Sequence, residues 1–219
     1  MVSVDVYDAL WDNRFNLHID TIAWRPYTSW PWWYIHHLVF LISCSAMSQS
    51  FLSLQKELVD TGWFIPFPAE YLHITLKAVK SYMKKEDTLD DSMKYSQTFV
   101  SSDSPILPFD IHFKWVNFFN NVVFVQCFDT WILELLHEKI ISHYGLPINS
   151  KRDLENYVPH IAIWTYIDSQ CIDKIYAIGQ KYRTFYFWSL HVDSYQFCDV
   201  VRSGITQFPS IDVIKKFNL

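Results

Sequence analysis

Two short stretches decide the fold that this sequence predicts: Leu72-His73-Ile74-Thr75-Leu76 and Pro159-His160-Ile161-Ala162-Ile163. In each stretch a histidine sits among alternating aliphatic residues. Side chains at positions i and i+2 of a strand point to the same face. Each histidine therefore shares a face with the residue two positions later, which is Thr75 in the first stretch and Ala162 in the second. The aliphatic residues point to the other face, which predicts two strands that each pack one face inward.

The same order of elements surrounds both stretches. The sequence predicts strand, helix, strand over residues 33–79 and again over residues 122–166, with the histidine strand last in each unit. Sequence identity between the two units is low, so the repeat is one of pattern. It predicts two similar lobes packed about a pseudo-two-fold axis, with the two histidine strands facing each other across a groove.

Patterning divides the chain into an aromatic-rich N-terminal extension, residues 1–33, and a two-lobed domain, residues 34–208, whose globular body begins near Trp33. The extension contains a predicted helix over 6–15. Residues 81–105 are polar and Ser-rich, which predicts a loop with at most one helical turn. The tail is expected to form no further element after Pro209. The remaining predicted strands are 109–117, 122–128, 183–192 and 194–201, and the remaining predicted helices are 48–60, 130–144 and 168–181.

Composition narrows the class of protein. The chain has 219 residues, 50% of them hydrophobic and 19% charged, which is typical of a folded globular protein. Its 18 Lys and Arg against 23 Asp and Glu give a net charge of -5, which disfavours long duplex nucleic acid as a main partner. With only 4 glycines and no GxGxxG or GxxxxGK[ST] motif, glycine-rich phosphate loops are nearly excluded.

Cysteine spacing and the N-terminus indicate the compartment. The four cysteines, Cys44, Cys127, Cys171 and Cys198, form no CxxC pair, so they predict reduced thiols and no zinc knuckle. The first residues are acidic and resemble no signal peptide. The uninterrupted apolar run 38–42 is far shorter than the ~20 residues of a membrane helix. We expect a cytoplasmic protein with no transmembrane segment.

Two imidazoles that face each other across a groove are suited to break a phosphodiester bond by proton transfer. One neutral histidine takes a proton from the attacking oxygen, and one protonated histidine gives a proton to the leaving oxygen. An ordinary histidine pKa of about 6.5 allows both forms near neutral pH, and each role contributes about 10²–10⁴ in rate. A neighbouring hydroxyl such as Thr75 can donate to a non-bridging phosphate oxygen. Neither metal nor cofactor is needed, and either histidine can be the base.

These motifs resemble the two-histidine (2H) phosphoesterase superfamily, the LigT-like group of 2′-5′ RNA ligases and cyclic phosphodiesterases. The resemblance covers residues 34–200 and rests on YLHITLKAV (71–79), LPFDIHFKWVNFFNNVVFVQC (107–127) and YVPHIAIWTY (157–166). It implies an α+β fold, with two pseudo-symmetric lobes of antiparallel sheet and outer helices around a central groove. It also implies His73 and His160 as the catalytic pair, and Thr75 as the phosphate donor.

The resemblance implies a metal-independent phosphodiesterase. Its substrate would be a small nucleotide or short RNA: a 2′,3′-cyclic phosphate end, a 2′-5′ linked oligonucleotide, ADP-ribose 1″,2″-cyclic phosphate or a cyclic oligonucleotide. We expect further residues near the motifs to line the substrate site. They are Ala162, Trp164, Tyr71, Tyr157, Lys77 and Arg152. Trp164 shares the His160 face and is a candidate for stacking on a base.

One position departs from the resemblance. Ala162 stands where the second motif of this superfamily usually has Thr or Ser, and alanine has no hydroxyl to donate. Losing one such donor typically lowers the rate by about 10²–10³. Lys77 or Arg152 are candidates for the missing positive contact. The alternative function is therefore a catalytically weak protein that binds nucleotides or RNA ends, and a third reading is an interaction protein that inherited the fold.

The other histidines predict no metal site. His36 and His37 are adjacent in a predicted strand, so they point to opposite faces. His137 and His143 are six positions apart on a predicted helix and face different ways.

Tyr71 and Tyr157, two of the expected substrate residues, also have a purely structural interpretation, as residues of the core.

Overall fold

The computed structural model describes residues 4–13, 33–43, 47–62, 64–98, 106–119, 122–146, 148, 153–166, 172–202 and 210–219. The predicted strands form as β1 (Trp33–Leu41), β3 (His73–Tyr82), β4 (Phe109–Phe119), β5 (Val122–Phe128), β6 (His160–Tyr166), β7 (Tyr186–Val192) and β8 (Ser194–Arg202). Two further strands are β2 (Phe64–Pro66) and β9 (Ser210–Asn218). The helices are α1 (Val4–Asn13), α2 (Gln49–Asp60), α3 (Glu86–Thr98), α4 (Ile132–Tyr144) and α5 (Ile172–Lys181).

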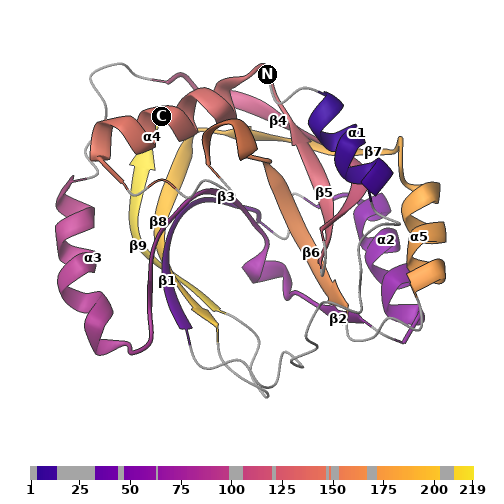
Figure 1. Ribbon diagram of the computed structural model, residues 1–219, viewed down its shortest axis with the longest axis horizontal. Coiled ribbons are helices and arrows are strands. Elements are labelled where there is room, and N and C mark those ends of the chain that lie inside the picture. The colour runs from indigo at the N-terminus through magenta and orange to yellow at the C-terminus, as the bar shows by residue number, and fades with distance from the viewer. Residues whose placement is uncertain are drawn as a thin grey trace.

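The described strands form one 9-stranded sheet in the order β7-β4-β5-β6-β3-β1-β8-β9, with β2 paired to β6. Every pairing in it is antiparallel. In the described part of the chain, β3 and β6 pair at one register position, Ile74 opposite Ile161. The sheet is thus two halves joined at a narrow junction, and these halves are the two predicted lobes. Figure 1 shows β9, β8, β1 and β3 on one side of this junction and β6, β5 and β4 on the other.

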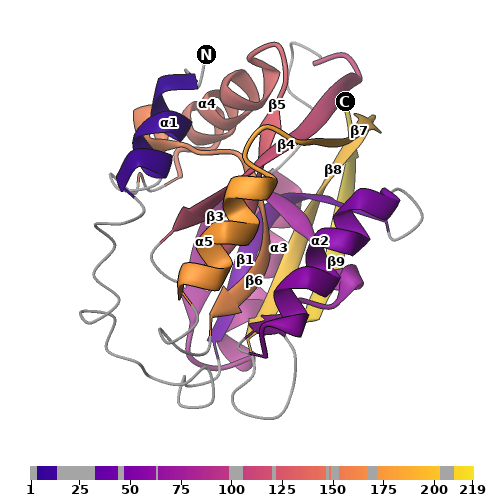
Figure 2. The ribbon, with the colours of Figure 1, turned by 90° about the vertical axis from the view of Figure 1, so that its right-hand side faces the viewer.

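Helices α2 and α4 are exchanged between the lobes. Helix α2 follows β1 in the chain, yet its Phe51 ring lies 5.0 Å from the ring of Trp188 on β7, and Figure 2 shows α2 beside α5. Helix α4 follows β5, yet His137 of α4 bonds the main-chain carbonyl of Leu76 on β3. Because each helix packs on the lobe opposite to its preceding strand, the exchange ties the lobes together.

Local sequence explains the start of α2. Ser48 is its N-cap, and the Ser48 hydroxyl accepts a hydrogen bond from the Phe51 amide at 3.3 Å. Such a bond satisfies one of the amides that a helix start leaves unpaired. Phe51, Leu54 and Leu58 are buried on one helical face, as their spacing predicts.

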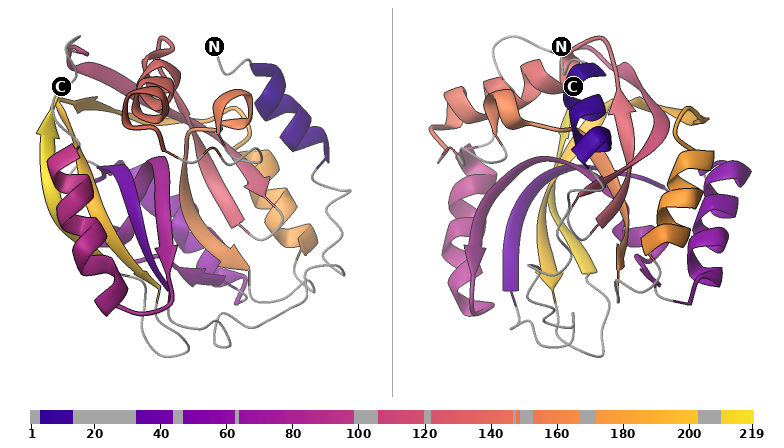
Figure 3. Two further views of the ribbon diagram at one scale, coloured as in Figure 1. Left: turned by 60° about the vertical axis from the view of Figure 1, so that its left-hand side comes forward. Right: turned by 45° about the vertical axis from the view of Figure 1, so that its right-hand side comes forward.

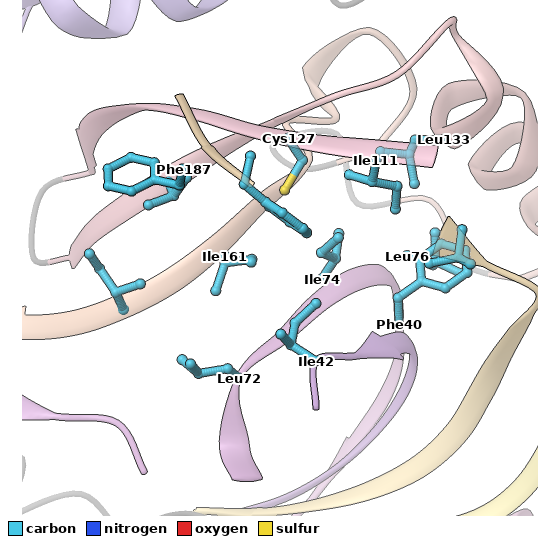
Figure 4. Close-up of a cluster of buried hydrophobic side chains, with 14 of the residues drawn as sticks. Phe40, Ile42, Leu72, Ile74, Leu76, Ile111, Cys127, Leu133, Ile161 and Phe187 are labelled. Carbon is cyan, nitrogen blue, oxygen red and sulfur yellow. The ribbon is translucent and has the colours of Figure 1, made fainter. Parts of the chain in front are cut away.

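One continuous hydrophobic core lies behind both histidine motifs. It joins Ile74 and Leu76 of β3 to Ile161 and Ile163 of β6, and it is closed by side chains of the helices, including Leu133 of α4. Figure 4 shows Leu72 and Ile74 beside Ile161 within this cluster, with Leu76 farther along next to Phe40. The aliphatic face predicted for each motif is therefore the buried face, and the histidine face is the opposite one.

Two predicted irregular segments are regular. The expected loop at 81–105 contains α3, and the tail expected to form no element contains β9. Helix α3 leaves Leu89 and Met93 exposed and buries Thr88 instead, so its sequence has no apolar stripe for periodicity to detect. Strand β9 is an edge strand, which gains its main-chain hydrogen bonds from β8 while most of its side chains stay exposed.

Helix α1 belongs to the globular body, although that body was expected to begin near Trp33. Tyr7 is fully buried, and its hydroxyl lies 2.6 Å from the carbonyl of Pro159. Trp11 packs against Phe118 of β4, with ring centroids 5.8 Å apart. Figure 3 shows α1 against the half of the sheet that contains β4 and β5. The rest of the aromatic segment, including Trp24, Trp30 and Trp32, lies outside the described residues.

None of the helices in the described ranges combines the length and apolar character needed to cross a membrane.

Candidate functional site

The two histidine motifs meet at the junction of the lobes. Ile74 and Ile161 are the middle residues of the two motifs, and they lie directly opposite each other. Because the strands are antiparallel, His73 and Ala162 lie on one side of this pair, and Thr75 and His160 lie on the other. The structure thus brings together the four residues that the sequence placed at the centre of the site.

Both imidazoles are held in the same way. The Nδ1 atom of His73 lies 2.7 Å from the carbonyl oxygen of Tyr71, and the Nδ1 atom of His160 lies 2.7 Å from the carbonyl oxygen of Val158. A carbonyl oxygen only accepts hydrogen bonds, so Nδ1 carries the proton in each ring. This fixes Nε2 as the nitrogen that gains or loses a proton, in both motifs.

A 3₁₀ turn precedes each motif. Residues Ala69–Tyr71 form the turn before β3, and residues Leu154–Asn156 form the turn before β6. Each turn leads into an extended residue, Leu72 in the first case and Tyr157 in the second. The accepting carbonyl lies two residues before the histidine in both lobes, so the pseudo-symmetry of the sequence pattern extends to hydrogen bonding.

Aromatic rings surround both imidazoles. The Tyr71 ring meets His73 edge-on at a centroid distance of 5.2 Å. Phe119 and Phe124 meet His160 at 4.8 and 5.2 Å. Both histidines are half-buried, so each ring has a fixed orientation and remains partly accessible.

Two further polar residues of this face were missed by sequence reasoning. The His37 ring lies 6.0 Å from the His73 ring, while its neighbour His36 bonds Tyr82 and Ser92, so the two have the different surroundings that strand geometry predicts. Gln126 lies opposite His160, and its buried amide has no hydrogen-bond partner among the described residues. The signal for Gln126 was present, because it is a lone amide within an apolar strand.

Two tyrosines predicted as substrate contacts are buried, in different surroundings. Tyr71 and Tyr157 are both buried. The Tyr157 hydroxyl donates to the main-chain carbonyl of Thr75 at 3.1 Å, and its ring stacks on His137 at 4.0 Å. The Tyr157 ring and hydroxyl thus support β3 from behind, as its structural interpretation predicts, and they do not reach the histidine face. Tyr71 is buried between Phe67 and His73, so its contact with substrate stays a prediction.

Lys77 is also absent from the histidine face. Its side chain is only 2% exposed and forms an ion pair with the buried Asp153. The register of β3 against β1 skips Leu76, because Thr75 pairs with Val39 and Lys77 pairs with the adjacent Leu38. This bulge breaks the alternation that would put Lys77 on the same face as Thr75. Its charge is already neutralised, so it does not supply the missing contact near Ala162.

The remaining predicted residues are placed only in part. Thr75 and Ala162 are half-buried, and their roles toward a substrate stay predictions. The backbone of Trp164 pairs with Val123 of β5, and its side chain lies outside the described part of the chain. Arg152 also lies outside the described residues.

Among the residues that the structure describes, no three His, Cys, Asp or Glu side chains gather closely enough to hold a metal ion. The arrangement that the site does offer is a pair of matched imidazoles, each able to exchange a proton at Nε2, beside one threonine.

Comparison with known proteins identifies the fold of this chain. No family model matches the sequence, and no curated protein matches it. Three similar crystal structures are TT0787 of Thermus thermophilus (15% identity, TM-score 0.56), a phosphoesterase (14%, 0.55) and E. coli LigT complexed with 3′-AMP (12%, 0.55). Each match covers 84% of this chain and 97% of the other. The chain therefore has the α+β, two-lobed LigT-like fold, as its two histidine motifs predict.

Proposed function

We propose that this chain is a 2H phosphoesterase that acts on a phosphodiester of a small nucleotide or short oligonucleotide. The substrate class is a 2′,3′-cyclic phosphate, a 2′-5′ linkage or a cyclic oligonucleotide. One observation carries the proposal: the two strands that meet at the lobe junction each present a histidine whose Nδ1 donates to the carbonyl two residues earlier. Two imidazoles held in the same tautomer, each with Nε2 as the nitrogen that exchanges a proton, suit general acid–base catalysis.

The step proposed is an in-line displacement at phosphorus. The attacking oxygen, from water or a ribose hydroxyl, bonds to phosphorus and gives its proton to Nε2 of the neutral histidine. The bond from phosphorus to the leaving oxygen breaks, and that oxygen takes the proton from Nε2 of the protonated histidine. One histidine gains a proton and the other loses one, so the pair returns to its starting state by exchange with solvent.

Thr75 is the proposed phosphate donor. It lies on the His160 side of the Ile74–Ile161 pair, and its strand position puts its side chain on the histidine face. The corresponding residue of the second motif, Ala162, donates nothing. The phosphate therefore receives a hydroxyl bond from one motif only, which predicts a slower enzyme than one with both hydroxyls.

The nucleotide part of the proposal draws support from the fold neighbours. The similar crystal structures include E. coli LigT complexed with ATP and with 3′-AMP. Those complexes concern LigT. They make a mononucleotide phosphate the natural first ligand to try on this chain.

The test is turnover in EDTA on a panel of nucleoside 2′,3′-cyclic phosphates, 2′-5′ oligoadenylates and cyclic di- and trinucleotides. Wild type is compared with His73→Ala, His160→Ala and a control, His191→Ala, which changes an exposed histidine of β7. We expect turnover that survives EDTA, falls about 10²–10⁴-fold in each motif variant and persists in the control. Turnover that is indifferent to both motif variants would refute the mechanism.

Ala162 favours a second candidate, a protein that binds nucleotides or RNA ends without turning them over. That candidate predicts tight binding of 3′-AMP that is lost in His73→Ala, together with no product on any member of the panel. A protein with neither binding nor turnover would instead be an interaction protein with an inherited fold.

A further inference from the structure

A cluster of buried polar side chains lies behind the first histidine motif. It contains Lys77 of β3, His137 of α4, and Asp153 and Tyr157 from the segment that leads into β6; we call it the Lys77 cluster. All four side chains are buried. Buried charges and histidines are rare without a partner, so each bond of the cluster is informative.

The bonds of the cluster converge on the main chain of β3. Tyr157 donates to the carbonyl of Thr75 at 3.1 Å, and His137 Nδ1 lies 2.6 Å from the carbonyl of Leu76. Lys77 itself pairs with Asp153. Three consecutive residues that begin with the motif threonine are therefore each held by a separate bond.

The other end of the cluster is the approach to the second motif. The Leu154 amide donates to Nε2 of His137 at 3.2 Å, so both nitrogens of this imidazole are used, one to donate and one to accept. The His137 ring also lies parallel to the Tyr157 ring, at an angle of 3°. The cluster thus links the strand of His73 to the segment that ends at His160.

This link supplements a narrow junction. Within the described residues β3 and β6 share one register pair, so their ladder fixes the motif spacing weakly. The cluster spans the same two motifs by independent bonds. A displacement of reacting groups by about 1 Å can cost about 10² in rate.

Backbone strain at Leu154 also indicates that the cluster holds the segment before β6 in place. Leu154 has a φ of 55° although it is not glycine, and its side chain is 42% exposed. The left-handed conformation is unfavourable for a residue with a side chain. Burial of the leucine does not explain it, whereas the bond from its amide to His137 does. Strain of this kind persists where surrounding contacts fix the backbone.

Stability alone does not account for the cluster. Replacing a buried ion pair by apolar residues of similar volume is often neutral or stabilising. We propose that Lys77, His137, Asp153 and Tyr157 are positioning residues, which hold the His73-Ile74-Thr75 segment at the productive distance from His160. This inference rests on the proposed phosphoesterase function and extends it to residues that do not touch substrate.

The first test removes one hydroxyl. Tyr157→Phe deletes the bond to the Thr75 carbonyl and keeps the ring stacked on His137. We expect kcat to fall about 10- to 10²-fold with KM nearly unchanged, because the reacting groups are displaced while the binding surface stays. The matched control is Tyr182→Phe, which deletes the bond from another buried tyrosine to Glu57 of α2. Equal kcat in the two variants would overturn the proposal.

The second test removes both charges together. Lys77→Met with Asp153→Leu leaves no unpaired buried charge, so this double variant is expected to fold with near wild-type stability. A loss of kcat in this folded protein is a readout that a purely structural role would not move. The urea midpoint of unfolding is measured alongside kcat. A double variant with the wild-type midpoint and the full wild-type kcat would count against a positioning role.

A third measurement separates this inference from the proposed function. Histidine-labelled protein is titrated with inorganic phosphate, and the imidazole signals of His73 and His160 are followed by NMR. We expect both to respond in wild type with one dissociation constant, and His73 to respond more weakly in Tyr157→Phe. If wild type lacks turnover but shows this difference, the function fails and the positioning role stands. An identical response in both proteins overturns the positioning role, and no response in wild type overturns both.

Discussion

Ile74 and Ile161 lie opposite each other at the centre of the sheet, both without exposed surface, and each is the middle residue of a histidine motif. Their burial anchors the strands, and their neighbours on either side point to the site. The same contact therefore joins the lobes and sets the two motifs side by side. Packing and chemistry at this junction are carried by alternate residues of the same strands.

Shortening Ile161 should weaken the junction. We expect Ile161→Ala to lower the free energy of unfolding by about 2–5 kcal/mol and Ile161→Val by about 0.5–1.5 kcal/mol, because each leaves a cavity in a packed core. Urea denaturation measures both. The control is Val213→Ala on β9, where the side chain is 52% exposed and the change should be small. Comparable losses for Ile161→Ala and the control would contradict the packing described.

Restoring a hydroxyl at Ala162 should improve the site. Ala162 lies beside His73 across the register pair, so Ala162→Thr adds a donor where charge develops on phosphate. We expect kcat to rise by up to about 10²-fold. Ala162→Val has nearly the same shape without the hydroxyl and serves as the control. A gain that is equal in both variants would show that shape, and not hydrogen bonding, limits the rate.

Stability should depend on pH through His137. Burial, partly offset by the Leu76 carbonyl and the Asp153 carboxylate, lowers the pKa of His137. The unfolded chain then binds the proton more readily, near its ordinary pKa of about 6.5. The contribution of neutral His137 is complete above that pH and is lost as the pH falls below it, toward the folded pKa.

Unfolding free energies at about pH 7.5 and about pH 5.5, on either side of the ordinary histidine pKa, measure this effect. His137→Phe keeps the stack on Tyr157 and removes the titrating group, so its stability should fall less between these two values than that of wild type. His143→Gln, at an exposed position of the same helix, should behave like wild type. Parallel pH profiles for wild type and His137→Phe would contradict the assignment.

The packing of helix α1 on the sheet should depend on the Tyr7 hydroxyl. Tyr7 reaches the carbonyls of Pro159 and Cys127 at 2.6 and 3.1 Å. Removing it leaves buried carbonyls without this donor, so Tyr7→Phe should cost about 0.5–1.5 kcal/mol. The control is Tyr186→Phe, whose hydroxyl is exposed and lies 3.5 Å from His112. Thermal unfolding compares them, and equal stability would mean that α1 does not rely on this bond.

The hydrophobic pattern of the sequence correctly predicted the strands and helices whose side chains are buried at regular intervals. The strands of the two motifs alternate aliphatic and polar residues, and α2 carries apolar residues at helical spacing, so both were predicted close to their observed limits. Patterning failed at α3 and β9, which expose most of their side chains. For such elements the structure is set by hydrogen bonds and by neighbours, and neither leaves a periodic signal.

By itself, the sequence determined the α+β pattern, the repeated histidine motif and the residues at its centre, because alternation in a strand is a local property of the chain. Only the tertiary structure decided which polar residues reach the site. The bulge at Leu76 turns Lys77 into the protein, and pairing between distant strands brings His37 to His73 and Gln126 to His160. A bulge changes the face of every later residue, and strand partners are chosen by packing across the whole core, so neither is encoded within a short window of sequence.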